Sequence, residues 1–384
     1  MEYFLTEQQK TIKSLARRIA EEKVLPVRAE LDEKEEFPHG IMKELANSDM
    51  FRVFIPEKYE GLGGGCLDLC LVVEELSRVC SGVAISYAAS ALGCFAILEH
   101  GTEEQKQKYL PDIAGGKLTA LAITESTAGS DAGAIKTTAE RVSGGYVLNG
   151  TKQFITNGGE AELYTVIALT DKTRGARGAS AFIVEKDTPG FSFGKKEKKM
   201  GIRASATREL IFRNCFIPET NIIGREGMGF IMLLRVFDQS RPGIAAQAVG
   251  LAQGALEAAV DYARQRQQFG HPIIALSVVQ YKLADMAIQV EAARALTYAA
   301  ARTVDSGARQ VSEESAMAKV FASDVAMRVT TDAVQIFGGA GYMRDYPVEK
   351  MMRDAKITQI YEGTNEVLHN TIAAELRKRR GRRE

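Results

Sequence analysis

The spacing of apolar residues divides the chain into three parts. In the first 117 residues the spacing is helical and follows a capping-box pair formed by Thr6 and Gln9. Thr102 and Gln105 repeat this pair before another helical stretch. The pattern therefore predicts an N-terminal helical domain over residues 1–117.

Between residues 118 and 226 the pattern changes to short β-rich runs separated by turn residues. Two of these runs are Leu163–Leu169 and Ala181–Val184. The segment Val142–Tyr146, with two central glycines, is typical of a hairpin. No helical run of about 10–15 residues separates the strands, which favours a central antiparallel β domain, a sandwich or a barrel.

After Gly227 the helical spacing returns in longer stretches. Apolar positions between residues 279 and 293 alternate steps of four and three, and a similar pattern runs from 315 to 336. This predicts a C-terminal four-helix bundle over residues 227–384. The predicted fold class is α+β multidomain. The alternating positions are Val279, Leu283, Met286, Val290 and Ala293.

One stretch, Val79–Leu98, contains twenty residues without a charge. Its length alone would allow a membrane span. Because serines, glycines and alanines lower its hydropathy, we interpret it as a buried core helix pair and expect no membrane association. The N-terminal residues lack the apolar region of a signal peptide, which indicates a cytoplasmic protein.

Charge and cysteine content exclude several classes of protein. The chain of 384 residues has 49 basic and 49 acidic residues, which argues against a nucleic-acid or membrane partner held by bulk charge. Five cysteines, an odd number, indicate reduced thiols in a cytosol-like compartment. The sequence has no HExxH or paired CxxC motif, so it predicts no metal site. We interpret the basic tail, residues 377–383, as a solvated end, with a binding arm as the alternative.

No nucleotide-binding fingerprint fits the sequence. The glycine-rich segment Gly61–Gly65 follows the polar residues Glu57–Glu60 where the fingerprint requires a hydrophobic strand, and no Lys-Ser/Thr pair comes after it. We interpret it as a loop, which disfavours a Rossmann-type nicotinamide enzyme.

Two other regions carry candidate chemistry, each with an ordinary alternative. In Ala122–Asp131 a strand ends in hydroxyl residues and a glycine, which either bind a phosphate or a heteroaromatic edge or form a plain polar turn. In Gln335–Tyr342 three glycines end a long helix and let another group approach the backbone. Glu362 lies in a glycine-containing break after Ile357 and Ile360, where it is either a general base of raised pKa or a surface glutamate near a helix N-terminus.

Taken together, these motifs resemble those of the acyl-CoA dehydrogenases, a family of flavin enzymes. Ile123–Asp131 resembles the first family signature and Gln335–Asp345 the second. Phe237–Pro242 and Arg266–Gly270 lie between them in the family's order. The match extends over nearly the whole chain, and the family fold agrees with the helical, β, helical order predicted above.

The resemblance implies an FAD site between the β domain and the C-terminal bundle. Residues of the first signature would line the flavin edge and pyrophosphate, and Phe154–Thr156 would lie along the isoalloxazine. Arg266 and Gln268, with Gln335–Gly339, would come from a neighbouring subunit, which implies a homotetramer built from two dimers. The implied cofactor-binding residues are Leu121, Ile123, Thr124, Gly129, Ser130, Phe154, Thr156, Arg266, Gln268, Phe269, Gln335, Gly338, Gly339, Thr364 and Glu366.

The resemblance also implies α,β-desaturation of an acyl-CoA thioester. Glu362 matches the base that removes the α-proton, while the β-hydrogen leaves as a hydride to flavin N5. The Glu362 backbone N–H would bond the thioester carbonyl as it gains enolate character, and the electrons would pass to an electron-transfer flavoprotein. The implied substrate contacts are Ser130, Asp238, Arg241, Tyr361 and Gly363.

Some positions depart from the family pattern. Family members that carry the base near position 240 differ from this chain, which has Ser240 there. Phe154 stands where many members have a tryptophan, and Ser126 and Ser277 replace a proline and a glutamine. The alternative functions are an acyl-CoA oxidase, an enoyl-CoA reductase and, less favoured, a non-catalytic scaffold.

The acyl group remains open at this stage. Small alanines within Val83–Cys94, part of the implied acyl pocket, allow a short, medium, branched or cyclic acyl group. The C-terminal half resembles short-chain, butyryl-type members.

Overall fold

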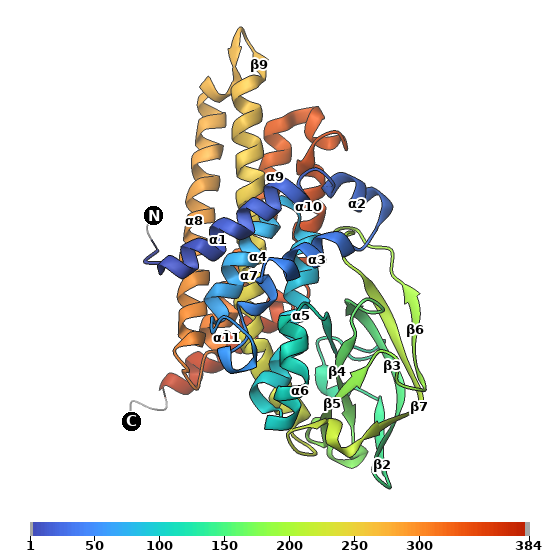
Figure 1. Cartoon of the computed structure of the whole chain (residues 1–384). Coiled ribbons are helices and arrows are strands. Elements are labelled where there is room, and N and C mark those ends of the chain that lie inside the picture. The colour runs from blue at the N-terminus through green and yellow to red at the C-terminus, as the bar shows by residue number, and fades with distance from the viewer. Residues whose placement is uncertain (1–2, 381–384) are drawn as a thin grey trace.

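The computed structural model describes residues 3–380, in which helices precede and follow a β domain (Figure 1). The side chains of Thr6 and Thr102 accept hydrogen bonds from the backbone N–H groups of Gln9 and Gln105, so both capping boxes are confirmed. The first group of helices comprises α1 (Glu7–Ile19), α2 (Arg28–Lys34), α3 (His39–Asn47), α4 (Cys66–Val79), α5 (Ser81–His100) and α6 (Glu103–Ala114).

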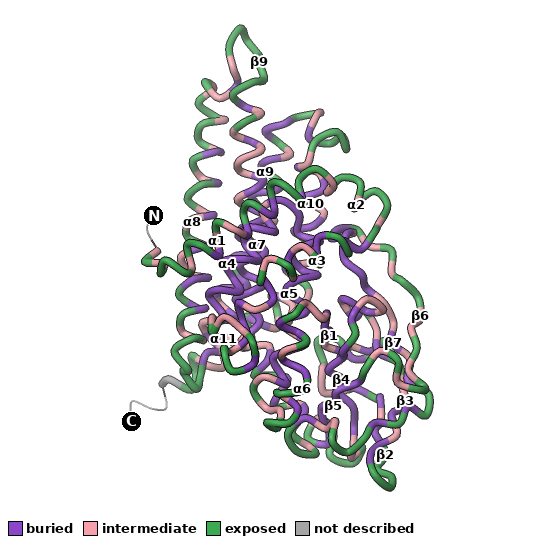
Figure 2. The backbone as a smooth tube through the Cα atoms, in the orientation of Figure 1, coloured by how far each residue is buried: buried purple, intermediate pink, exposed green. Residues whose placement is uncertain are grey.

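The uncharged stretch 79–98 lies in the interior of this domain. Among the described residues, only α5 is long and apolar enough to cross a membrane, yet 89% of its apolar window is buried. Figure 2 shows this interior as buried backbone around α4, α5 and α7. The prediction of a helix pair was wrong, because the stretch forms the last residue of α4 and most of one helix, with the extended Cys80 between them.

The β domain contains one sheet in the order β6-β7-β3-β2-β4-β5-β8, with β1 beside β4. The predicted hairpin is confirmed, since Val142 pairs with Gly145. Its strands are β1 (Thr119–Ala122), β2 (Thr138–Val142), β3 (Gly145–Thr156), β4 (Leu163–Leu169), β5 (Ala179–Glu185), β6 (Phe191–Lys196), β7 (Thr207–Pro218) and β8 (Ile222–Ile223).

Most strand pairs are antiparallel, as predicted, but two are not. β1 pairs with β4 in parallel over four residues, and β2 meets β4 through one parallel pair, Thr138 with Leu169. The chain between β1 and β4 includes the β2–β3 hairpin, which provides the long crossover that a parallel pair needs.

The C-terminal domain is built on three long helices. These are α7 (Gly229–Gln265), α8 (Ser277–Asp305) and α9 (Ser312–Phe337); α10 (Pro347–Thr358) packs on α7 and α9, and α11 (Asn365–Arg380) packs on α9. The apolar seam of α8 is buried from Leu283 to Ala293, with Val279 half-buried. A short hairpin of β9 (Gln267–Gln268) and β10 (His271–Pro272) joins α7 to α8.

Helix α7 also joins the two helical domains. A Cβ added at Gly250 would lie 2.1 Å from the Glu74 carbonyl oxygen, so only glycine allows α4 to pack this closely against α7. Gly61–Gly65 forms a loop before α4, as predicted. Arg377 and Lys378 are exposed on α11, and residues 381–383 of the basic tail lie outside the described part of the chain.

Candidate active site

Glu362 lies in a tight turn between α10 and α11. Its φ is 58°, and that of Gly363 is 95°, so both residues are in the left-handed region. This conformation is strained for a glutamate and persists only where the surroundings hold it. Arg241 Nε donates to the Glu362 carbonyl oxygen at 3.2 Å, and Lys319 Nζ donates to the Gly363 carbonyl oxygen at 2.8 Å. Two buried cations, one on α7 and one on α9, therefore fix consecutive carbonyls of the turn.

The Glu362 carboxylate contacts a hydroxyl on α7. Ser240 Oγ donates to Glu362 Oε2 at 2.7 Å. Burial raises the pKa of Glu362, while the Ser240 hydrogen bond and the charges of Arg241 and Lys319 oppose that rise. A buried carboxylate with a raised pKa that opens into an apolar space is a stronger base than an exposed glutamate.

A narrow cavity of about 20 Å³ adjoins this carboxylate. Its walls come from α4, α5 and α7, and apart from Glu362 and Ser240 they are apolar or glycine. Gly243 widens it, because a Cβ added there would have only Leu69 Cδ2, at 3.9 Å, within contact distance. The lining residues are Leu69, Ile85, Ala88, Ala89, Leu92, Phe95, Ser240, Gly243, Ile244 and Glu362.

A buried ion pair fixes the loop after β1, which contains the first signature. Lys152 Nζ donates to Glu125 Oε1 at 2.8 Å and to the Ile123 carbonyl oxygen at 3.0 Å. Glu125 also accepts the backbone N–H groups of Lys136, at 2.6 Å, and Thr137, at 3.0 Å. Burial alone would raise the pKa of Glu125, but Lys152 and the hydrogen bonds hold it below its usual range. The carboxylate thus stays charged and fixes both ends of the loop.

Phe154 projects from the sheet beside this loop. The β3–β7 register shifts between Lys152 and Ile155, Phe154 has a φ of 59°, and 55% of the residue is exposed. The Gln153 N–H donates to the Thr124 carbonyl oxygen at 2.8 Å, which ties the strand to the first signature. An exposed ring in a strained bulge offers a stacking surface for a planar heteroaromatic group.

A second group of predicted cofactor residues lies elsewhere. Arg266, Gln268 and Phe269 occupy the α7–α8 hairpin, which Figure 1 places at the end of the helical domain away from the β domain. The Tyr262 and Phe337 rings stack at 4.0 Å between their centres and bring the ends of α7 and α9 together. Gln335, Gly338 and Gly339 therefore lie near this hairpin. Within a single chain they are remote from Phe154.

The remaining predicted residues cluster around Glu362 or stay at the surface. Asp238 Oδ1 accepts from Arg241 Nη1 at 2.7 Å, and Tyr361 donates to Gln247. Thr364 accepts the Val367 N–H at the start of α11. Ile123 is buried, whereas Leu121, Thr124 and Thr156 are half-buried. Gly129, Ser130 and Glu366 are exposed.

The sequence predicts no individual role for four residues of the site. Ser240 enters the prediction only as a residue that is not a glutamate, and Glu125 only as one member of the first signature. Lys319 and Lys152 do not enter it. Lys319 carried a signal, because it is a charged residue on the otherwise apolar and small-residue face of α9.

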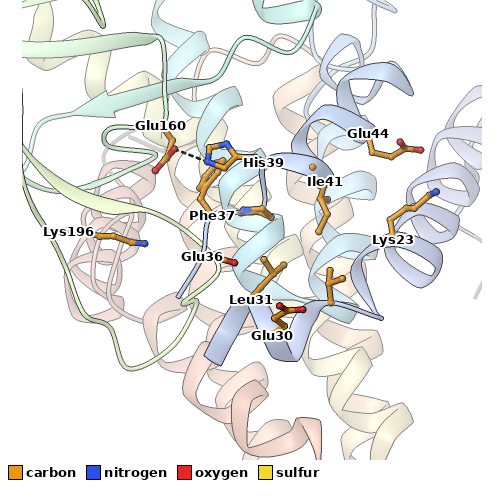
Figure 3. A pocket seen from close by; sticks show the side chains of 13 residues that line it. Lys23, Glu30, Leu31, Glu36, Phe37, His39, Ile41, Glu44, Glu160 and Lys196 are labelled. Carbon is orange, nitrogen blue, oxygen red and sulfur yellow. Dashed lines mark ion pairs between the residues drawn. The ribbon is translucent and has the colours of Figure 1, made fainter. Parts of the chain in front are cut away.

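A larger cavity, of about 740 Å³, lies between the first helices and the β domain (Figure 3). His39 Nε2 and Glu160 Oε2, 3.3 Å apart, bridge its two sides. None of its lining residues is a predicted site residue. They are Lys23, Val27, Glu30, Leu31, Glu36, Phe37, Pro38, His39, Gly40, Ile41, Glu44, Glu160 and Lys196.

Comparison with known proteins decides the family. The acyl-CoA dehydrogenase N-terminal, middle and C-terminal domain models match residues 6–117, 120–215 and 227–377 in turn. The chain belongs to the acyl-CoA dehydrogenase family. It is therefore an oxidoreductase and a flavoprotein that uses FAD in the desaturation of acyl-CoA thioesters.

Individual relatives resemble this acyl-CoA dehydrogenase over almost their full length. Butyryl-CoA dehydrogenase from Megasphaera elsdenii is 46% identical with a TM-score of 0.95, covering 98% of this chain and 100% of that one. A chain from a structure of the electron transferring flavoprotein of Acidaminococcus fermentans is 49% identical with a TM-score of 0.96, covering 98% and 99%. Acryloyl-CoA reductase (NADH) of Anaerotignum propionicum is 47% identical over 382 residues, 99% of this chain and 97% of that one.

The described residues fit FAD. The exposed Phe154 ring provides a stacking surface beside the first signature. A Cβ added at Gly129, Gly338 or Gly339 would meet no atom within 4 Å, so the backbone is open to a ligand at both groups of predicted cofactor residues.

Proposed function

We propose that this chain desaturates a short-chain acyl-CoA thioester between its α and β carbons, with Glu362 as the base that removes the α-proton. The observation that carries the proposal is the Glu362 carboxylate, with a raised pKa, in the wall of a narrow apolar cavity. The acyl chain would occupy the cavity and leave its α-carbon facing Glu362.

The chain's own groups would bind and orient the thioester. Glu362 lies beyond the end of α10, and its peptide N–H has no acceptor among the described residues. It would donate to the thioester carbonyl oxygen, where negative charge develops as the α-proton leaves. When bound, FAD supplies the acceptor for the β-hydrogen. The apolar walls would exclude water and favour proton transfer to Glu362.

The large side chains of Leu92 and Phe95 in the cavity wall favour a short acyl chain. Butyryl-CoA is expected to exceed octanoyl-CoA in kcat/KM by at least ~10-fold, because a methylene that does not fit the cavity lowers kcat/KM by about that factor. Phe95 is the largest lining side chain, and Phe95→Ala should raise the octanoyl to butyryl ratio of kcat/KM.

The matched control for this chain-length test is Phe54→Ala. Phe54 is buried and packs edge-on against Phe95, with 6.4 Å between ring centres, but it does not line the cavity. Equal shifts in both variants, or a wild-type preference for octanoyl-CoA, would refute the short-chain assignment.

The electron acceptor is proposed to be an electron-transfer flavoprotein, supported by the likeness to the A. fermentans chain. A second candidate is enoyl-CoA reduction, favoured by the likeness to the A. propionicum reductase. Steady-state rates separate the two. Desaturation requires crotonyl-CoA formation with an electron-transfer flavoprotein or a dye as acceptor, whereas a reductase would consume crotonyl-CoA with NADH. An oxidase would instead reduce oxygen at a comparable rate.

The working form is proposed to be a cytoplasmic homotetramer that binds no membrane. Apolar side chains are exposed on the α7–α8 hairpin, on α8 and after α9; Phe269, for example, is 86% exposed. A neighbouring subunit would cover these residues and bring its hairpin to the flavin. They are Phe269, Val278, Tyr281, Ile288, Tyr342 and Met343.

Arg266→Ala is expected to lower FAD content and tetramer content together, because Arg266 would serve a site between subunits. Flavin absorbance per chain and light scattering measure the two quantities. Arg264→Ala is the control. Arg264 is an exposed neighbour whose only ion pair among residues 3–380 is with Asp261 on the same helix, at 3.6 Å. A fully flavinated tetramer of Arg266→Ala would count against a site shared between subunits.

A further inference from the structure

Lys319 is a buried lysine beside the catalytic turn. None of its surface is exposed, and its Nζ donates to the Gly363 carbonyl oxygen at 2.8 Å and to Asn365 Oδ1 at 3.0 Å. Among the described residues it forms no ion pair with a carboxylate, unlike Lys152 and Lys350, the other buried lysines. Its donors therefore go to neutral oxygens on either side of Thr364.

A buried cation without an ion pair is costly, so packing alone does not account for it. An apolar side chain of similar length would fill the same space without the cost of removing a charge from water. Two effects account for a lysine here, one that needs a hydrogen-bond donor and one that needs a positive charge. One is the hydrogen bond to a carbonyl of a strained turn, and the other is a positive field close to the Glu362 carboxylate.

The hydrogen bonds of Asn365 fix the end of the turn relative to α9. Asn365 Nδ2 donates to Ser323 Oγ at 2.9 Å and to Asp324 Oδ1 at 2.8 Å. Because Ser323, Asp324 and Lys319 all lie on α9, this helix holds the start of α11 and the end of the turn as one unit.

We infer that Lys319 is a positioning residue, which holds the Glu362–Gly363 turn from α9 and keeps the Glu362 carboxylate ready to accept a proton. This inference rests on the proposed role of Glu362 as the base. Lys319 does not touch the cavity, since it is absent from its lining. It acts on the reaction through the turn and through its charge.

Lys319 is the main source of positive charge beside the turn. Arg241 is the other nearby cation, but Asp238 pairs with it at 2.7 Å and offsets its charge. Helices α4 and α5 face Glu362 with apolar side chains only. The charged and titratable groups around the turn are Asp238 and Arg241 on α7, Lys319 and Asp324 on α9, Asp354 on α10, Tyr361 in the turn and Glu366 on α11.

The test compares Lys319→Gln, Lys319→Met and Lys319→Arg as flavin-loaded enzymes. Glutamine keeps a donor for the Gly363 carbonyl oxygen but removes the charge, methionine removes both, and arginine keeps both. The positive charge lowers the pKa of Glu362, so its loss should raise that pKa. The acid limb of the kcat/KM pH profile should then move up by about one pH unit in Lys319→Gln and Lys319→Met. The arginine variant should stay near the wild-type profile.

Arg294→Met is the matched control, because Arg294 is a buried cation of the same domain that pairs with Glu74 at 2.9 Å and not with the turn. Its acid limb should not move, even if its melting temperature falls. A lower melting temperature with an unmoved acid limb in Lys319→Gln would show a merely structural lysine and overturn the inference. If Lys319→Met does not fold, the pH profile of Lys319→Gln alone tests the inference.

Glu362→Gln, assayed in parallel, separates this inference from the proposed function. An inactive Glu362→Gln with an unmoved Lys319→Gln profile rejects only the role of Lys319. An active Glu362→Gln rejects the proposed base itself, and with it the inference about Lys319.

Discussion

Replacing Glu362 by glutamine is expected to reduce turnover by ~10²–10⁴-fold, the usual contribution of a general base. Glutamine keeps the size of the side chain and an oxygen that can accept the Ser240 hydrogen bond, which is 2.7 Å long in the native protein. The turn should survive, because Arg241 and Lys319 hold its backbone carbonyls and not its carboxylate. The variant should therefore bind FAD and acyl-CoA normally and lose only proton abstraction.

Stopped-flow reduction of the flavin by butyryl-CoA measures the predicted loss directly. Glu375→Gln is a suitable control, since Glu375 is a carboxylate on α11 that pairs with Lys378. The flavin of this variant should be reduced at the wild-type rate. Near-normal reduction in Glu362→Gln would remove Glu362 from the role of base.

Lys152→Met is expected to cause the largest loss of stability and to weaken FAD binding. Lys152 is fully buried, and its removal leaves the Glu125 carboxylate buried without its cation. Breaking a buried pair in this way costs about 3–5 kcal/mol. The first-signature loop should also shift, because Glu125 joins its two ends through the Lys136 and Thr137 N–H groups. Urea unfolding and titration of the apoprotein with FAD measure the two effects.

A double variant separates the charge effect from lost packing. Lys152→Met combined with Glu125→Gln removes the uncompensated charge and should recover part of the unfolding free energy. Lys108→Met, at the largely exposed pair with Glu185, should change the unfolding free energy by only about 0–1 kcal/mol. If Lys152→Met binds FAD as tightly as the wild type, the ion pair does not shape the flavin loop.

Local features of the fold were predictable from the sequence, whereas long-range pairings were not. The capping boxes at Thr6 and Thr102 satisfy their hydrogen bonds within four residues, so the sequence carries the whole signal. The parallel pairing of β1 with β4 joins residues more than forty positions apart and depends on the crossover between them. Nothing in the four residues of β1 specifies that direction.

The candidate site divides in the same way. Glu362 and the two signatures were found because glycine breaks and motif spacing are local. Ser240 and Lys319 contact the turn from 122 and 44 residues away, and only the packing of α7 and α9 brings them there. The resemblance identified Phe154, while the strand bulge and positive φ that expose its ring appear only in the structure.

Anaerobic titration of the purified flavoprotein with a panel of acyl-CoA thioesters tests the central claim most directly. The panel comprises butyryl, octanoyl, isobutyryl, isovaleryl, glutaryl and cyclohexanecarboxyl thioesters, and the flavin absorbance is followed. We expect rapid bleaching by butyryl-CoA, slower bleaching by octanoyl-CoA, and none with Glu362→Gln. Bound FAD that no thioester bleaches, or equal bleaching of Glu362→Gln, would contradict this claim.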